Sequence, residues 1–513
     1  MQSNRRLRDN GARLSVLLSL LLVASPHGAG QTTPAGAGGS SQYGTGTGSS
    51  SASAGQATAS GPSQYGTAPG TGSQSPFQGS VPTGQPTGTT LALSIKEAFD
   101  RALRYNLGAI ESTQNTRSAR AERLRNLSAL LPNLYGQLSG SVQQINLQAE
   151  GLRLSTIPGL RIPTIIGPFT VADIRGYLSQ RVFNWSDIKN WKSSSQSETA
   201  ALYSYKSDRD LVVLVTAMAY LQVLSDAANV ETNRAQVRTN QTIYQQDLDQ
   251  NKQGVIASID VLRAKVQLQT QQQQLIAVEN QLAVDKLTLA RIIGLPNGQD
   301  FQLTDPVPYA AVPDITLEQA LQQAHASRPD YLAAKAQVRA AELAHQAAAA
   351  ENYPWVGLTA NYGDIGSPNF GASHGTFSVA GTLTIPLFLG TQVRADKLQA
   401  DSVLQDRKAQ LADLGGKIDD QVRTAFFNLH SSSELVTVAQ SNIELANQTL
   451  TQAQDRFTAG VTNNLEVVQA QQAVAAANQS YIASLYSYNS AKISLAQAIG
   501  VAEQSGLEYL GVK

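Results

Sequence analysis

The stretch GVIASIDVLRAKVQLQ, residues 254–269, has a counterpart later in the chain. GVTNNLEVVQAQQAVA, residues 460–475, lies 206 positions further on and has the same skeleton. Both stretches open with Gly followed by Val, and the carboxylate of Asp260 corresponds to that of Glu466. A single match means little in a chain rich in Ala and Gln, so the surrounding sequence has to show whether a larger duplication exists.

Further matches extend over most of the chain. LSIKEAF at residues 93–99 aligns with ITLEQAL at 315–321, an offset of 222. An insertion of 17 residues in the first half, around 152–168, reduces the offset to about 206, which then persists to IGL at 293 and IGV at 499. The sequence therefore predicts two tandem repeats, residues 91–314 and 315–513.

Each repeat is expected to form a helix, two strands, a long helix, a turn and another helix. Residues 184–253, 255–293 and 461–499 contain neither Gly nor Pro, which favours long helices. Apolar residues recur every seven positions after the first turn, which predicts coiled-coil packing. These positions are Val261, Leu268, Leu275, Leu282 and Leu289. Gly415 and Gly416 predict a bend in the partner helix, because each Gly costs about 1 kcal/mol relative to Ala.

Four segments alternate apolar and polar residues, as half-buried strands do. The clearest is GTFSVAGTLTIPLF, residues 375–388, in which Phe377, Val379, Leu383, Ile385 and Leu387 would share one face. The others are 134–142, 170–183 and 355–362.

The N-terminal region predicts export. Residues 1–30 resemble a secretory signal peptide, with four arginines before an apolar run at 14–24 that is too short to span a bilayer. We expect no later transmembrane helix. Residues 31–90 contain no charged side chain and are dominated by Gly, Ser, Thr, Gln and Pro, which predicts a disordered tether.

Composition argues against several classes of protein. The chain has no Cys, which excludes disulfides, thiolate metal sites and a lipid-bearing cysteine. Its 38 basic and 38 acidic residues leave no basic excess for binding nucleic acid. No H-E-x-x-H spacing or G-x-S-x-G turn is present, and His325 and His345 are expected on the surface. We therefore expect that the protein is not an enzyme and binds neither a metal nor a cofactor.

An exported chain with two-faced strands suggests an outer-membrane barrel in contact with lipid. Four strands cannot close, and the hydrocarbon does not tolerate the unpaired edges of an open sheet. Two chains would give eight strands with a filled interior, whereas three would give twelve and an open channel. The sequence therefore predicts a homotrimer.

The duplicated pattern, the strand endings RVFNW and IPLFLG, and the motifs GVIASIDVLRA and GVTNNLEVVQA resemble the TolC-type outer membrane efflux proteins over about residues 91–501. The resemblance implies a mixed α/β fold in which a trimeric 12-stranded barrel continues into a long periplasmic α-helical barrel. It also implies a passive exit duct of a tripartite efflux or type I secretion system in a Gram-negative-type bacterium. A periplasmic adaptor and an inner-membrane pump would be its partners.

In that family the two hairpin tips narrow the periplasmic entrance and meet the adaptor. The resemblance therefore assigns the turns and adaptor docking to Gly254, Val255, Arg263, Gly460 and Val461.

Asp260 and Glu466, in three copies each, would ring the entrance and favour cations. The alternative is that both are ordinary solvated carboxylates, with Asp260 paired to Arg263 one turn later. A different class also remains open for the whole chain, namely a periplasmic coiled-coil adaptor or tether without a pore. The sequence does not indicate the cargo.

Overall fold

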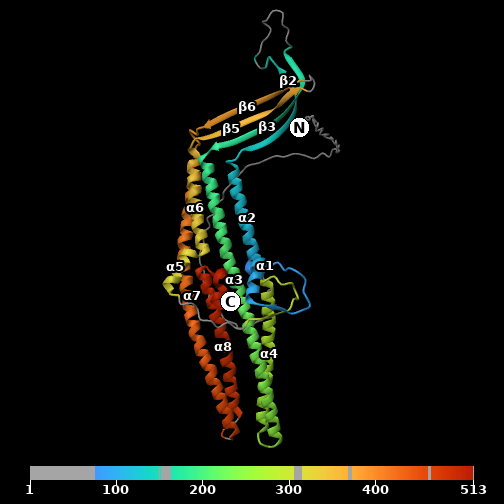
Figure 1. Ribbon diagram of the computed structural model, residues 1–513, viewed down its shortest axis with the longest axis vertical. Helices are drawn as coiled ribbons and strands as arrows, with labels where there is room; N and C mark the ends of the chain where they lie inside the picture. The colour runs from blue at the N-terminus through green and yellow to red at the C-terminus, as the bar shows by residue number, and fades with distance from the viewer. Residues whose placement is uncertain are drawn as a thin grey trace, which may run out of the picture. The chain divides into compact units, whose positions relative to one another are not determined.

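The computed structural model describes residues 75–149, 151, 163–305, 315–367, 372–459, 461 and 464–511, which all lie within one compact unit, Thr71–Lys513. The predicted signal peptide and residues 31–74 of the predicted tether lie outside the described residues. Within the compact unit, a four-stranded sheet lies at one end of a set of long helices, and two helical hairpins end at the other (Figure 1).

The same order of elements occurs twice along the chain. Each half has two shorter helices, where the sequence predicted one, followed by two strands and a long helical hairpin. The first half contains α1 (Ile95–Tyr105), α2 (Leu107–Ser128), β2 (Asn133–Asn146), β3 (Ile165–Phe183), α3 (Trp185–Lys252) and α4 (Ser258–Ile292). The second contains α5 (Leu317–Ser327), α6 (Pro329–Ala349), β5 (Trp355–Ser367), β6 (Ala372–Thr384), α7 (Gln392–Thr458) and α8 (Asn464–Ile499). The remaining elements are η1 (Pro76–Gln78), η3 (Ala350–Asn352), α9 (Ala502–Leu510), and the parallel pair β1 (Leu91–Leu93) and β4 (Phe301–Leu303).

The first helix of each half begins with the same local signal. The Ser94 hydroxyl accepts a hydrogen bond from the Glu97 amide, and the Glu97 carboxylate accepts one from the Ser94 amide. Thr316 and Gln319 form an equivalent capping box before α5. Because a capping box satisfies two amides that would otherwise lack partners, both helix starts are fixed by local sequence.

The helices α3 and α7 cover 68 and 67 residues. At about 1.5 Å per residue, each is roughly 100 Å long. Asn184 starts α3 by accepting hydrogen bonds from the amides of Ser186 and Asp187. α7 is helical throughout, including Gly415 and Gly416, although each Gly costs about 1 kcal/mol relative to Ala in a helix interior. Contacts with α8 along its length help to stabilise this helix. The bend at these glycines stays a prediction.

The main hydrophobic core surrounds the middle of α3. Tyr220, Leu289, Ile493 and Ile499 are among its fully buried side chains. A window of 18 residues in α3 has a mean hydropathy of 1.7, so by length and composition this helix could cross a membrane, but half of the window is buried within the unit. The sequence predicted no later transmembrane helix; α3 meets only the length and composition criterion, so this stays a prediction. The apolar residues of α3 are accounted for by the core that they build.

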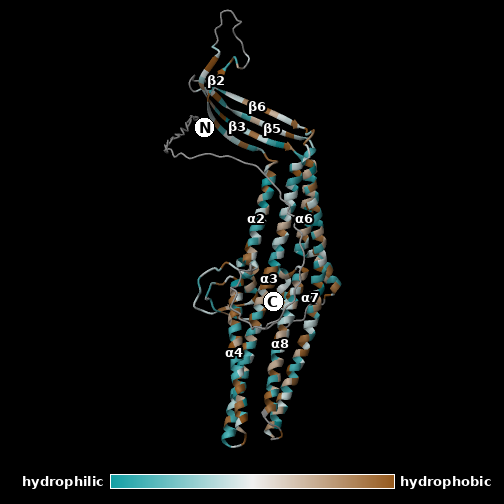
Figure 2. Ribbon diagram, turned by 180° about the vertical axis from the view of Figure 1, so that it is seen from behind, coloured by the Kyte–Doolittle hydropathy of each residue, from teal (hydrophilic) through white to brown (hydrophobic). Residues whose placement is uncertain are grey.

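The strands β2, β3, β5 and β6 form one antiparallel sheet in that order, so β2 and β6 are its edges. Directly opposed residues point to the same face of a sheet, and neighbours along a strand point to opposite faces. Figure 2 shows hydrophobic and hydrophilic residues along each strand. The register separates them into an apolar face and a polar face. The apolar face includes Leu134, Leu138, Val142, Ile174, Leu178, Tyr362, Phe377, Val379 and Leu383; the polar face includes Tyr135, Gln137, Ser139, Asp173, Arg175, Tyr177, Asn361, Ser378 and Thr382.

All four predicted strands are present, but their boundaries differ. β6 ends at Thr384, four residues before the predicted end, and Pro386 lies just beyond. Proline has no amide hydrogen for the ladder, which accounts for the earlier end. Consequently Ile385, Leu387 and Phe388 lie outside the strand and are 54%, 93% and 87% exposed. The other three strands are longer than predicted.

Residues 75–90, predicted to belong to the disordered tether, pack against the first half. Phe77 lies so close to Gly108 that a Cβ there would be 2.6 Å from Phe77 Cε1. The Phe77 carbonyl accepts a hydrogen bond of 2.8 Å from Asn106 Nδ2, and the Thr87 amide donates one of 2.8 Å to Gln299 Oε1. The prediction is wrong for this segment because one aromatic ring and backbone hydrogen bonds hold it, and a lack of charge does not reveal either.

A carboxyl pair lies between α3 and α4. Asp226 of α3 is 6% exposed and accepts a hydrogen bond of 3.0 Å from Gln222 Nε2. Burial, followed by a hydrogen bond and repulsion involving Asp285 of α4, raises the pKa of Asp226 from 3.8 to about 7. Ionised Asp226 is therefore costly in the folded state.

Asp226→Asn is expected to stabilise the protein at high pH. A carboxyl group whose pKa is raised by folding favours the folded state at pH below 3.8, and this contribution is lost as the pH rises to about 7. The variant should therefore unfold at a higher temperature than the wild type at pH 8 and show little gain at pH 4. Circular dichroism in mild detergent measures the unfolding temperature at both pH values. Asp249→Asn, which changes an exposed carboxylate, is the control. An equal gain at both pH values would contradict the role given to ionisation.

Candidate functional site at the helical hairpin tips

The first hairpin turns by a motif that depends on Gly254. Helix α3 ends at Lys252, and Gly254 has φ +75°, a left-handed conformation that glycine adopts without strain. The Val255 amide donates to the Gln250 carbonyl at 2.9 Å, which is the long-range bond of a Schellman motif. Asn251 Nδ2 donates to the Ile256 carbonyl at 2.8 Å. These bonds satisfy backbone carbonyls at the tip.

The second hairpin contains the equivalent bond. The Val461 amide donates to the Arg456 carbonyl at 3.0 Å, and both residues lie 206 positions after the pair in the first turn. Gly460, predicted to make this turn, lies outside the described residues. The matching bond indicates that α3 and α7 end in the same way before the chain reverses.

Both predicted gate carboxylates are paired with an arginine of the same chain. Asp260 Oδ1 lies 3.1 Å from Arg263 Nη1 within α4, as the solvated-carboxylate alternative predicted. Glu466 Oε1 of α8 lies 2.9 Å from Arg456 Nη1 of α7. The carboxylate side chains are 29% and 37% exposed. Each tip therefore joins one acid to one base at its half-exposed surface.

The sequence did not predict the pair across the second hairpin. Gln250 stands in the first half where Arg456 stands in the second, and Gln469 stands in the second where Arg263 stands in the first. An alignment of the two halves shows this difference, because each tip has one arginine but at a position that the other tip does not share.

An apolar groove of about 440 Å³ separates the two hairpins near their tips. Its apolar lining comes from Ile259, Leu262 and Val266 of α4 and from Leu465 and Val468 of α8, and Asp260, Arg263 and Gln267 of α4 complete it. The first three side chains are 53%, 58% and 61% exposed. At the turns themselves Val255 and Val461 are 68% and 70% exposed, so both tips present apolar side chains to their surroundings.

Further from the tips, a polar groove of about 640 Å³ lies between α3, α4, α7 and α8. Asn and Gln side chains dominate its lining. Gln271 Nε2 donates to Asn233 Oδ1 at 2.7 Å within the first hairpin, and Gln472 Nε2 donates to Gln267 Oε1 at 3.1 Å between the hairpins. The groove therefore offers hydrogen-bonding groups without net charge.

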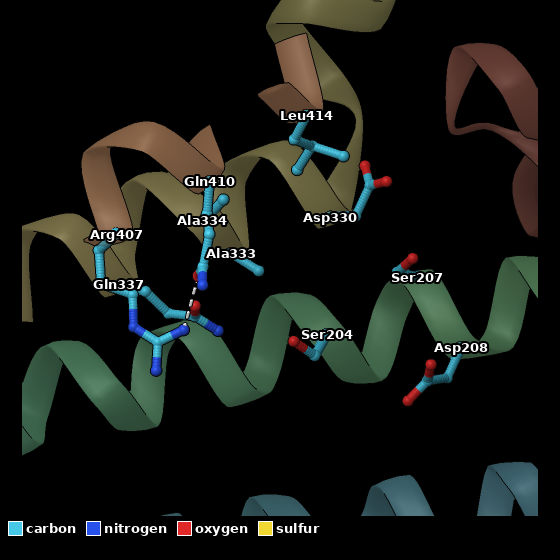
Figure 3. Close-up of a pocket in the computed structure, with 10 residues that line it drawn as sticks. All are labelled: Ser204, Ser207, Asp208, Asp330, Ala333, Ala334, Gln337, Arg407, Gln410 and Leu414. Atoms are coloured by element: carbon cyan, nitrogen blue, oxygen red, sulfur yellow. Dashed lines mark hydrogen bonds between the residues drawn. The ribbon is translucent and has the colours of Figure 1, made fainter. Parts of the chain in front are cut away.

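A smaller pocket of about 360 Å³ lies between α3, α6 and α7 (Figure 3). Ser204 and Asp208 of α3 line it with Gln337 of α6, while Arg407 Nη1 of α7 donates to Gln410 Oε1 at 2.8 Å. Burial raises the pKa of Asp208. The residues that line this pocket include no histidine, so Ser204 has no adjacent general base of the kind that serine nucleophiles use.

His325, predicted to be a surface residue, is a contact between helices. Its Nε2 lies 2.7 Å from Asp419 Oδ1 of α7, and its ring meets that of Tyr331 edge-on with centroids 5.3 Å apart. This contact joins α5 to α7, so its evident role is structural.

The fold and the paired hairpins identify a class of outer-membrane channel. Residues 172–295 and 320–501 match the family described as "Outer membrane efflux protein", which covers more than half of the chain. The protein belongs to this family. It is an outer-membrane channel of the efflux and secretion type, with a periplasmic part.

Two relatives with names are similar to this chain over most of its length. Outer membrane protein TolC of Escherichia coli (strain K12) is 24% identical in an alignment 359 residues long, which covers 64% of this chain and 69% of TolC. Alkaline protease secretion protein AprF of Pseudomonas aeruginosa is 24% identical in an alignment 346 residues long, which covers 65% of this chain and 70% of AprF.

Solved structures share the fold. The outer membrane protein VceC from Vibrio cholerae has a TM-score of 0.67 at 16% identity, covering 79% of this chain and 96% of VceC. The CmeC outer membrane channel of Campylobacter jejuni has a TM-score of 0.65 at 15% identity, covering 87% of this chain and 98% of CmeC. The fold of the single chain, mostly helical with one sheet, is therefore like that of these outer-membrane channels, as predicted.

Proposed function

We propose that three copies of this chain form one 12-stranded barrel and serve as the passive exit duct of a tripartite efflux or type I secretion system. The observation that carries this proposal is the sheet, whose edges β2 and β6 each pair with a single strand in the described residues. Unpaired edges are too costly in hydrocarbon. Pairing β6 of one copy with β2 of the next satisfies both, and three copies leave an open lumen.

The two faces of the sheet fit this barrel. Leu134, Leu138 and Phe377 on the apolar face are 77%, 72% and 78% exposed in the single chain. In the trimer this face contacts lipid, and the polar face lines the lumen. A periplasmic adaptor without a pore would gain nothing from such a sheet, so that alternative is not favoured.

The hairpin tips are proposed as the periplasmic entrance and adaptor-docking site. The exposed Val255 and Val461 and the apolar groove between α4 and α8 support docking of an adaptor, which would connect the duct to an inner-membrane pump. Gly254 allows the first turn, Gly460 is proposed for the second, and Arg263 pairs with Asp260. The signal peptide at residues 1–30 and the two repeats at residues 91–314 and 315–513 belong to the same proposal.

The conduit function is tested directly by measuring the current across a planar bilayer to which the purified wild-type protein has been added. Discrete conductance steps are expected, and a protein that is released by osmotic shock and gives no steps would contradict the proposal.

The same bilayers test the proposed acidic gate. Asp260→Asn combined with Glu466→Gln should lower the preference for cations, because Arg263 and Arg456 would lose the carboxylates that balance them. The converse pair, Arg263→Gln with Arg456→Gln, should raise it, and trimer yield should stay unchanged in both. Cation selectivity that is unaltered by the carboxylate variant at low and high salt would show that these are ordinary solvated charges.

A further inference from the structure

The polar face of the sheet carries an aromatic layer in a row that crosses the middle of β5 and β6 and lies near the start of β2. Tyr135 of β2 directly opposes Tyr177 of β3, and their rings are stacked with centroids 5.2 Å apart and planes at 14°. The same row continues through Asn361 of β5 and Ser378 of β6. Each chain therefore places two large rings side by side at one height of the sheet.

In the next row of opposed residues, the side chain of Arg175 lies along the surface of the sheet. Arg175 opposes Gln137 and Gly363, and its Nε lies 2.7 Å from Asp173 Oδ1. Both charged side chains are only 23% and 21% exposed. A Cβ at Gly363 would lie 2.5 Å from Arg175 Cγ, so this glycine leaves room for the arginine stem to run along β5. The charges balance one another beside the tyrosines.

The rest of the central polar face is built from smaller groups. Ser139, Thr359, Thr376, Ala380 and Thr382 occupy neighbouring positions on this face. Tyrosine is larger than any of these residues. The ion pair with Asp173 keeps the Arg175 side chain close to the sheet. Within these rows, the stacked rings are thus the side chains best placed to narrow a lumen that this face surrounds.

We propose that three copies of the Tyr135–Tyr177 stack form the narrowest layer of the barrel lumen and retard planar aromatic solutes more than saturated ones. This inference rests on the proposed trimeric barrel. Six phenol rings at one height reduce the open cross-section, and ring faces and edges interact favourably with other aromatic groups. Because Arg175 and Asp173 neutralise each other next to this layer, it discriminates by shape and aromatic character, not by net charge.

The absence of Cys from the sequence provides a direct test with single introduced thiols. Tyr135→Cys and Leu134→Cys are adjacent on β2 and point to opposite faces, so they form a matched pair. The probe is the water-soluble anionic thiol reagent sulfonatoethyl methanethiosulfonate, added to channels in a planar bilayer. Labelling should remove most of the current through Tyr135→Cys and Tyr177→Cys channels and leave Leu134→Cys channels unchanged.

A second measurement uses no thiol. The double variant Tyr135→Ala, Tyr177→Ala should conduct more than the wild type, while Tyr362→Ala, on the apolar face, should not. Phenol should reduce the wild-type current more than cyclohexanol does, and the double variant should lose this difference.

The outcomes separate this inference from the conduit proposal. Wild-type protein that forms no channel would refute the conduit. Wild-type channels combined with unlabelled Tyr135→Cys, with labelling that leaves the current intact, or with equal block of Leu134→Cys would overturn the aromatic layer. Equal effects of phenol and cyclohexanol on the wild type would overturn its aromatic selectivity.

Discussion

Leu138→Arg is expected to abolish the assembled protein in the outer membrane. Leu138 is 72% exposed on the apolar face and opposes Ile174, which is 59% exposed. An arginine on the lipid face near the bilayer midplane costs about 2–4 kcal/mol, and a trimer would carry three. The outer-membrane fraction should therefore contain little or no folded oligomer, as measured by semi-native gel electrophoresis.

Ser139→Arg provides the matched control. Ser139 is the next residue along β2 and opposes Asp173 on the polar face, so a new guanidinium would lie near a carboxylate in the proposed lumen. Its assembly should remain close to that of the wild type. If Ser139→Arg fails as completely as Leu138→Arg, or if both assemble, the assignment of the two faces to lipid and water is wrong.

The second large effect is expected at the hairpin turn. Gly254→Val introduces a β-branched residue at φ +75°, where a side chain other than glycine costs about 1–3 kcal/mol. No atom lies within 4 Å of the Cβ position, so the cost arises from the backbone and not from a clash. The Schellman bond from Val255 to Gln250 should be lost, and hydrogen exchange of residues 250–258 should rise sharply.

Gly254→Asn separates the backbone effect from the loss of glycine itself. Asparagine adopts the left-handed conformation more readily than valine, so this variant should retain most of the protection. Trimer yield should be unchanged in both variants because the turn lies at the opposite end of the helices from the sheet (Figure 1). Equal protection in the valine and wild-type proteins would show that the turn does not depend on the glycine conformation.

Local signals made much of the fold predictable. Each of these signals depends only on residues that are close together in the sequence. They are the capping boxes at Ser94 and Thr316, the long runs without Gly or Pro, and the alternation around Phe377. The matching turn bonds at Val255 and Val461 follow from the duplicated Gly-Val sequence.

Features that depend on contacts between distant residues were not predictable in the same way. Arg456 reaches Glu466 only because α7 and α8 fold back on each other. Phe77 is fixed by Gly108 and Asn106, although it lies in a segment whose composition predicts disorder. The stacked Tyr135 and Tyr177 become neighbours only through the strand register.

The shared barrel is tested most directly by the mass of the purified protein. Native mass spectrometry in mild detergent, with detergent and lipid removed in the gas phase, gives the number of chains without reference to shape. We expect a single species of three chains, because the four strands of one chain leave β2 and β6 unpaired and three copies close them into twelve. A monodisperse monomer that is folded and stable would contradict the account.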